Sequence, residues 1–201
     1  MKIRTITLAL GASVTMALLA GCTTTKTMPG MGHGTTPAPT GITSAPDASY
    51  NMADVMFVEM MIPHHEQAIE MCDMILGKSG VDPTITALAQ KIKDAQQPEI
   101  DEMKGWLQDW GIGDQSGMMD GMGHGTGMMS EDDMTALNAA DGADAGHIFL
   151  DQMIQHHTGA IDMAQSEVAD GKDPGVLKLA QNIISSQTAE TEVMKSLLGV
   201  N

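Results

Sequence analysis

From about residue 50 to its end, this chain carries apolar residues at intervals of three and four, the spacing of helices with one buried face. The pattern predicts a first helix over 50–78, which Ser79-Gly80 ends. Asp82-Pro83 then provides an N-cap and a first helical position for a second helix that runs to about Trp110. We expect these two helices to form a hairpin.

The same signals return after a segment rich in Gly and Met. Ser130, with Asp133 three residues later, predicts a short helix over about 130–142. A long helix over about 145–170 follows, and Asp173-Pro174 opens a last helix that ends near Gly199. The sequence has no alternating run of Val, Ile or Tyr and no Asn-Gly turn. The predicted fold class is therefore all-α.

The predicted helices fall into two similar halves. The segment Phe-Val-Glu-Met-Met-Ile-Pro-His-His-Glu-Gln-Ala-Ile-Glu-Met at 57–71 returns as Phe-Leu-Asp-Gln-Met-Ile-Gln-His-His-Thr-Gly-Ala-Ile-Asp-Met at 149–163. A single hairpin cannot bury its own apolar face, so we expect two hairpins to pack as a pseudo-twofold four-helix bundle over 50–201. The bundle would consist of a first repeat over 50–111, a linker over 112–130 and a second repeat over 131–201.

The first residues have the features of an export signal. Lys2 and Arg4 precede an apolar run over 6–19, and the run ends in Leu19-Ala-Gly-Cys22, which resembles the lipobox of bacterial lipoproteins. We predict a signal peptide over 1–21, lipidation at Cys22 and a flexible tether over 22–49, which is too poor in large apolar residues to fold alone. The alternative is a secreted protein without a lipid.

The amino-acid composition excludes some partners and points to methionine as a ligand. The net charge of -16 at pH 7 argues against nucleic acid as a partner and would concentrate cations near the protein. Methionine numbers 20 and aromatic residues make up 2%, so Met must fill much of the core and is also available as a ligand. Cys72 is the single Cys after the predicted signal and lipobox, so an intramolecular disulfide is excluded there.

Metal-ligating residues recur with the repeat. Each copy keeps an adjacent pair, His64-His65 or His156-His157, with one Met four residues before the second His and another six after it. On a helix these His residues border the face that turns inward. A core segment needs to repeat only its apolar spacing, whereas imidazole and thioether together are copper ligands. Packing is the better explanation of any one of these residues, but their joint duplication favours a metal. Pro63 is expected to distort the first copy, because the second has Gln155 in its place.

The second helix of each half adds further candidates. Glu99 and Met103 are echoed by Glu190 and Met194. The two Glu residues would accept hydrogen bonds from the second imidazole nitrogens or coordinate the metal directly, and solvated helix charges are the alternative. Cys72 is expected to be a buried small hydrophobe, because the repeat has Ala at its counterpart.

Two loops share a further motif. Met-Pro-Gly-Met-Gly-His-Gly-Thr at 28–35 returns as Met-Asp-Gly-Met-Gly-His-Gly-Thr at 119–126. Thioethers with one imidazole suit Cu(I) or Ag(I) better than Mg, Ca or Zn, and Gly lets the chain wrap an ion closely. A plain low-complexity linker is the alternative. The candidate ligands in these loops are Met28, Met31, His33, Met119, Met122 and His124.

With Met61-Ile-Pro-His-His in the first copy and Met153-Ile-Gln-His-His in the second, the chain resembles domain-of-unknown-function family 305, the CopM-like copper-binding proteins of bacteria. The resemblance covers about 50–198. It implies a ferritin-like four-helix bundle, an extracytoplasmic location, and a role in binding copper and resisting its toxicity. The ligand set that it implies is Met61, His64, His65, Met71, Met153, His156, His157 and Met163.

These observations favour a copper-binding lipoprotein of the cell envelope or periplasm. It would sequester or carry Cu(I), and also Cu(II) or Ag(I), and pass copper to an exporter or an oxidase, without enzymatic activity of its own. One alternative is a ferritin-like metal oxidase, although the sequence lacks the Glu-x-x-His of di-iron sites and the His-Glu-x-x-His of zinc sites. The other is a structural envelope lipoprotein whose Met-rich surface binds a protein partner.

Overall fold

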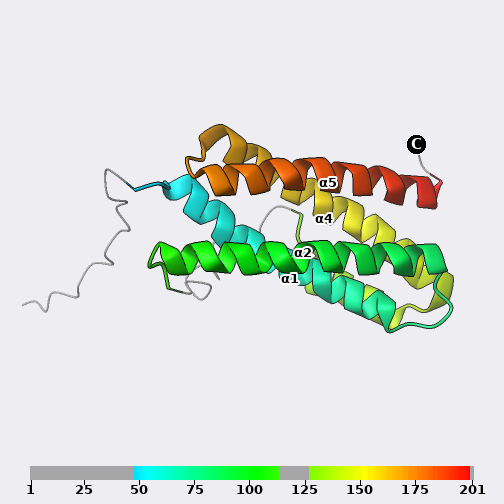
Figure 1. Ribbon diagram of the computed structural model, residues 1–201. Helices are drawn as coiled ribbons and strands as arrows, with labels where there is room; N and C mark the ends of the chain where they lie inside the picture. The colour runs from blue at the N-terminus through cyan, green and yellow to red at the C-terminus, as the bar shows by residue number, and fades with distance from the viewer. Residues whose placement is uncertain (1–47, 114–126, 200–201) are drawn as a thin grey trace, which may run out of the picture. The chain divides into compact units, whose positions relative to one another are not determined.

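The structure, a computed structural model, describes residues 48–113 and 127–199. These residues form five α-helices and no strand, which confirms the all-α fold class (Figure 1). The helices are α1 (Met52–Leu76), α2 (Pro83–Asp109), α3 (Glu131–Ala139), α4 (Gly142–Asp170) and α5 (Pro174–Leu198). Over the two described ranges, no helix has the length and apolar character needed to span a membrane.

Capping contacts confirm three of the predicted helix starts. Asp82 accepts a hydrogen bond from the Thr84 N–H at 2.6 Å, directly before Pro83. Asp173 caps α5 in the same way. Ser130 and Asp133 form the predicted capping box of α3. The fourth start differs, because α4 begins about three residues before the predicted position, in a Gly-Ala-Asp stretch that carries no apolar signal.

The first helix is shorter at both ends than predicted. Asn51 caps its start and Gly77 its end, so the helix covers Met52–Leu76 rather than 50–78. Pro63 does not interrupt it. A proline inside a helix removes one backbone hydrogen bond, but Pro63 is exposed, so its ring lies on the solvent side and not in the core.

The helices α1 and α4 are the inner ones, and α2 and α5 the outer ones. α1 packs along α2, α4 packs along α5, and α1 and α4 pack on each other. Figure 1 shows α1 running obliquely to α2, and α4 to α5. The burial patterns follow from these contacts. α5 buries a single stripe at intervals of three and four, whereas α1 buries residues on two faces because it has two long neighbours.

Two apolar clusters fill the interior, one toward each end of the helices. The first apolar cluster includes Val55, Phe57, Val58, Met61, Ile100, Met103, Ala160, Met163, Leu179 and Ile183. The second apolar cluster includes Ala68, Met71, Cys72, Ile75, Leu88, Ile92, Phe149, Leu150, Met153 and Met194. Along each long helix, the turn between the two clusters carries buried polar side chains.

The short helix α3 covers the second apolar cluster. It packs on α4 and α1, and its Leu137 is fully buried in that cluster. Gln152 of α4 donates a hydrogen bond to the Asp133 carbonyl at 2.8 Å. Lys78 donates to the carbonyls of Asn138 and Ala140, which fixes the end of α3 to the turn after α1.

A buried acidic pair, Asp54 and Glu167, lies at the opposite end. Asp54 is fully buried and accepts hydrogen bonds from the backbone N–H groups of Asn51, Lys172 and Asp173 at 2.6, 3.0 and 2.8 Å. It thereby ties the start of α1 to the turn between α4 and α5. Burial, and next the adjacent Asp54 carboxylate, raise the pKa of Glu167 from 4.5 to about 8.

The variant Glu167→Gln should remove a pH dependence of stability. Between about pH 4.5 and pH 8 the folded chain keeps a proton on Glu167 that the unfolded chain releases, so the free energy of unfolding should fall as the pH rises through this range. Gln cannot lose a proton. We compare the free energies of unfolding of the variant and of wild type at each pH. This difference should shift in favour of the variant by on the order of 2 kcal/mol between pH 5 and pH 9. Urea unfolding at both pH values measures this, and equal differences at the two pH values would contradict it.

Candidate metal centre

Four imidazoles meet in the turn between the two apolar clusters. His64 and His65 come from α1 and His156 and His157 from α4, and none is more than 1% exposed. The rings of His64 and His156 are 3.8 Å apart between centroids and tilted by 41°. We call these four residues the histidine layer. The two His-His pairs of the sequence therefore face each other across the contact of the inner helices.

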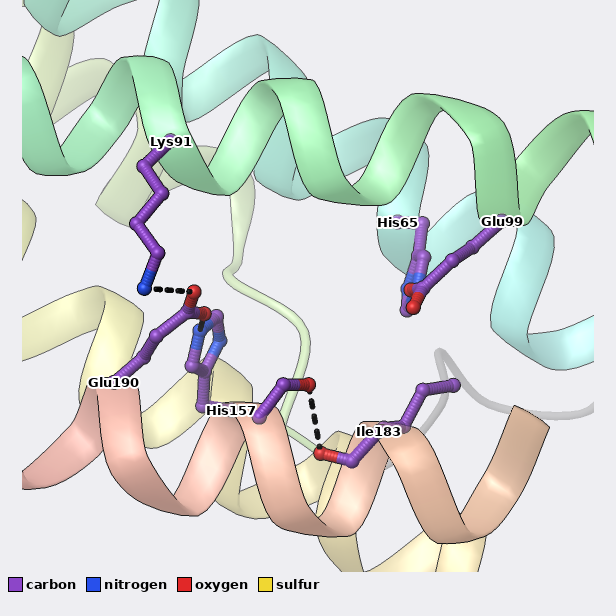
Figure 2. A network of polar contacts seen from close by, with 7 residues as sticks. His65, Lys91, Glu99, His157, Ile183 and Glu190 are labelled. Atoms are coloured by element: carbon purple, nitrogen blue, oxygen red, sulfur yellow. Dashed lines mark hydrogen bonds and ion pairs between the residues drawn. The ribbon is translucent and has the colours of Figure 1, made fainter. Parts of the chain in front are cut away.

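Each outer helix supplies a carboxylate to the layer. His65 Nε2 lies 2.8 Å from Glu99 Oε2, and His157 Nε2 lies 3.0 Å from Glu190 Oε2 (Figure 2). An ionised carboxylate only accepts, so each Nε2 carries the hydrogen and each Nδ1 keeps its lone pair. The Nδ1 atoms of His65 and His157 are buried, with no hydrogen-bond partner among the described residues. Metal-ligating imidazoles are commonly oriented by a carboxylate in this way.

The layer favours neutral imidazoles. Burial, and next the neighbouring His64, His157 and His65, hold the pKa of His156 well below 6.5. Neither ring nitrogen of His156 makes a hydrogen bond of standard geometry with the described residues. Burial also lowers the pKa of His157, although Glu190 opposes this effect. A neutral imidazole presents the lone pair that a metal needs.

A lysine distinguishes the two ends of the histidine layer. Lys91 Nζ lies 3.5 Å from Glu190 Oε1, and Figure 2 shows the Lys91 side chain reaching from α2 toward α5. Burial alone would raise the pKa of Glu190, but His157 and Lys91 lower it overall. The counterpart of Lys91 in the second half is Asn182, so Glu99 has no such cation from the matching position. The run Leu-Ala-Gln-x-Ile is repeated in both halves, and only its fourth residue changes, from Lys to Asn. This difference was the one sign in the sequence that Lys91 has a role of its own.

The predicted thioethers flank the layer symmetrically. Three lie in the first apolar cluster and their three sequence counterparts in the second, and each is at most 7% exposed. They are Met61, Met103 and Met163 on one side, and Met153, Met194 and Met71 on the other. Cys72 is buried among apolar residues as expected, and its burial raises the pKa of the thiol to about 12, which keeps it protonated and a poor ligand.

The geometry limits how an ion is held. Within 48–113 and 127–199, no three His, Cys, Asp or Glu side chains are arranged to hold a metal ion by themselves. Buried thioethers, however, lie on both sides of the imidazoles in this interior. Mixed ligands of this kind suit copper and silver and do not suit magnesium or calcium.

The end of the Gly- and Met-rich linker returns to the helices beside the histidine layer. Gln67 donates to the Met129 carbonyl at 3.0 Å and accepts from the Met129 N–H at 2.7 Å. A Cβ on Gly127, whose φ is +87°, would lie 2.8 Å from the Gly159 Cα, so this approach requires glycine. Gln67 and Gly159 each lie within one turn of a layer histidine. Sequence reasoning missed this contact.

Several predicted residues lie outside the described part of the chain. They include the lipidation site Cys22 and the loop candidates Met28, Met31, His33, Met119, Met122 and His124. These assignments stay predictions.

Comparisons with known proteins point to one group. Residues 54–198 match the family described as domain of unknown function DUF305. A DUF305 protein of Streptomyces coelicolor, described as a candidate secreted protein, is 31% identical, with a TM-score of 0.67, over 73% of this chain and 92% of that one. A DUF305 fragment of Deinococcus radiodurans is 29% identical, with a TM-score of 0.69, over 76% and 99%.

A third solved structure contains a metal. CopM in the Cu(II)-bound form is 37% identical, with a TM-score of 0.62, over 72% of this chain and 94% of that one. CopM is also known in Cu(I)-bound, Ag-bound and apo forms. No curated protein matches the sequence.

Proposed function

This chain belongs to the DUF305 family, and we propose that it is an extracytoplasmic copper-binding protein that holds Cu(I), and also Cu(II), through His and Met side chains. The observation that carries this proposal is the histidine layer. Four buried imidazoles gather where an ordinary helical core would have apolar residues, and the Nδ1 atoms of His65 and His157 have no hydrogen-bond partner among residues 48–113 and 127–199. Leaving buried polar atoms unpaired costs stability, so their retention supports a function.

The metal is proposed to be copper because of the neighbouring ligands. Neutral imidazoles and three thioethers on each side form a soft set that favours Cu(I) and Ag(I). The CopM structures with Cu(II), Cu(I) and Ag support this choice for the family. Copper is the cargo of such a protein, which would bind, buffer and pass it on to an exporter or an oxidase.

We propose a ferritin-like four-helix bundle as the scaffold and Cys22 as a lipid anchor. The two packed hairpins support the bundle, and the Leu-Ala-Gly-Cys motif after the apolar run supports the anchor. Mass spectrometry of the protein extracted from membranes tests the anchor. An unmodified chain that still begins before Cys22 would contradict it.

Competition with a Cu(I) chelator under anaerobic conditions tests the function. We expect the whole chain to retain Cu(I) against an equimolar chelator, and Zn(II) or Mg(II) at the same concentration not to displace it, because hard and borderline ions gain little from thioethers. The same sample, given oxygen and excess Cu(I) or Fe(II), should show no sustained oxygen uptake. Displacement of copper by Zn(II) would contradict the proposed ligand set, and saturable turnover would favour a metal oxidase.

A further inference from the structure

A groove opens between the N-terminal half of α1 and the C-terminal half of α4. Its volume is about 360 Å³. Met56, Phe57 and Met60 line it from α1, and Met163, Glu167 and Asp170 line it from α4. We call it the methionine groove. It is distinct from the histidine layer, since none of the four histidines lines it.

The side chains of the groove combine soft ligands with a buried acid. Met56 is 43% exposed and Met60 half-buried, whereas Met163 is 7% exposed. Glu167 is 2% exposed and shares a hydrogen bond with the adjacent Asp54 carboxylate. Three thioethers thus line the groove beside a buried carboxyl group, and thioethers are ligands that suit a soft cation.

The other half of the molecule provides an internal comparison. The counterparts of Met56, Met60 and Glu167 are Ile148, Gln152 and Ile75. At that end α3 packs over α1 and α4, and Gln152 is engaged by the Asp133 carbonyl. In the other half, the equivalent contact between α1 and α4 is made without Met or Glu. Helical packing therefore does not require Met at positions 56 and 60 or Glu at position 167.

The groove also lies close to the histidine layer along both helices. Met60 precedes His64 by one helical turn, so the two side chains lie on the same face of α1. Met163 follows His156 by two turns on α4. An ion held in the groove is thus on the side of α1 that leads to the adjacent His64–His156 pair.

We propose that the methionine groove is a second binding site, for a soft monovalent cation of the Cu(I) class, in which Met56, Met60 and Met163 supply thioethers and the carboxyl group of Glu167 supplies an oxygen ligand. This inference rests on the proposed copper-binding function and adds to it a solvent-accessible site that receives the ion before the histidine layer. Thioethers bind Cu(I) and Ag(I) without losing a proton, which suits capture at a surface.

Titration with Ag(I) as a diamagnetic probe, followed by NMR of methyl-labelled methionine in the whole chain, tests the groove directly. The methyl signals of Met56, Met60 and Met163 should shift together in one binding step, and that of Met52, which is exposed on the same helix outside the groove, should not shift in that step. A first step that leaves the signals of Met56 and Met60 unmoved would overturn the proposal.

Copper stoichiometry separates this inference from the proposed function. The double variant Met56→Ile/Met60→Gln, which copies the residues of the other half, should bind one fewer Cu(I) ion in the chelator assay, and Met52→Leu should match wild type. Glu167→Gln, which should fold at least as well as wild type, should bind that ion at least ~10-fold more weakly. If the double variant binds as much copper as wild type while histidine variants lose copper, the groove proposal is wrong and the proposed function stands. If neither kind of variant loses copper, both are wrong.

Discussion

The double variant His64→Leu/His156→Leu is expected to bind Cu(I) at least ~100-fold more weakly than wild type, because loss of a residue that merely orients a ligand already costs up to that factor. The two rings lie 3.8 Å apart at the contact of α1 and α4, so the change removes the centre of the histidine layer. Leu has a volume similar to that of His and fills the space. The change also removes buried polar ring nitrogens from an otherwise apolar interior, so the metal-free variant should stay within about 1 kcal/mol of wild type.

Chelator competition and urea unfolding of the metal-free protein measure the two effects on one sample. His147→Leu is the matched control, since His147 lies on α4 but is exposed and outside the layer. The combination of weaker copper binding and undiminished stability marks a residue kept for function. An unchanged copper affinity in the double variant would refute the histidine layer as the copper site.

Asp54→Ala is expected to destabilise the chain by about 3 kcal/mol and to lower its melting temperature by roughly 10 °C. The change leaves the backbone N–H groups of Asn51, Lys172 and Asp173 without their acceptor. Hydrogen bonds to a carboxylate are among the stronger ones, and this carboxylate is fully buried and accepts three of them. The change also removes the hydrogen bond between Asp54 and Glu167.

Asp73→Ala is the control for this measurement. Asp73 lies on the same helix and pairs with Lys93, but the side chains of both are at least one-third exposed. Exposed ion pairs contribute little, so this variant should stay within about 0.5 kcal/mol of wild type. Thermal unfolding of the two variants, both without metal, gives the comparison. Equal losses would mean that the Asp54 contacts are no more important than a surface pair.

Local signals explain why much of the fold was predictable. The caps at Asp82, Ser130 and Asp173 act through contacts within three residues, so the sequence contains both partners. The paired His residues also had a predictable burial. Their spacing placed them at the border of the inward face of each helix. In the structure, His64 faces the other inner helix and His65 faces α2.

The features that sequence reasoning missed depend on partners far along the chain. Lys91 and Glu190 are 99 residues apart (190 − 91), and their pairing follows from how the two hairpins meet. Nothing in the sequence around Glu167 distinguishes it from other helix residues. It becomes part of a buried acidic pair only because Asp54, far away in the sequence, lies beside it. The packing of α3 on α1 and α4 was also unpredicted, because a nine-residue helix carries too little apolar surface to indicate where it will pack.

The buried acidic pair also bears on whether two identical halves could pack together in the way that the two unlike halves do. A primitive form with one hairpin would close the same interior as a homodimer, each copy providing one His-His pair. The present halves no longer suit that arrangement. The counterpart of Asp54 is Gly146, so two second halves placed together would set Glu167 against glycine at both ends, with no side-chain acceptor for the amides of Lys172 and Asp173. Asp54 lies in the first half and Glu167 in the second, so the buried acidic pair can form only between unlike halves.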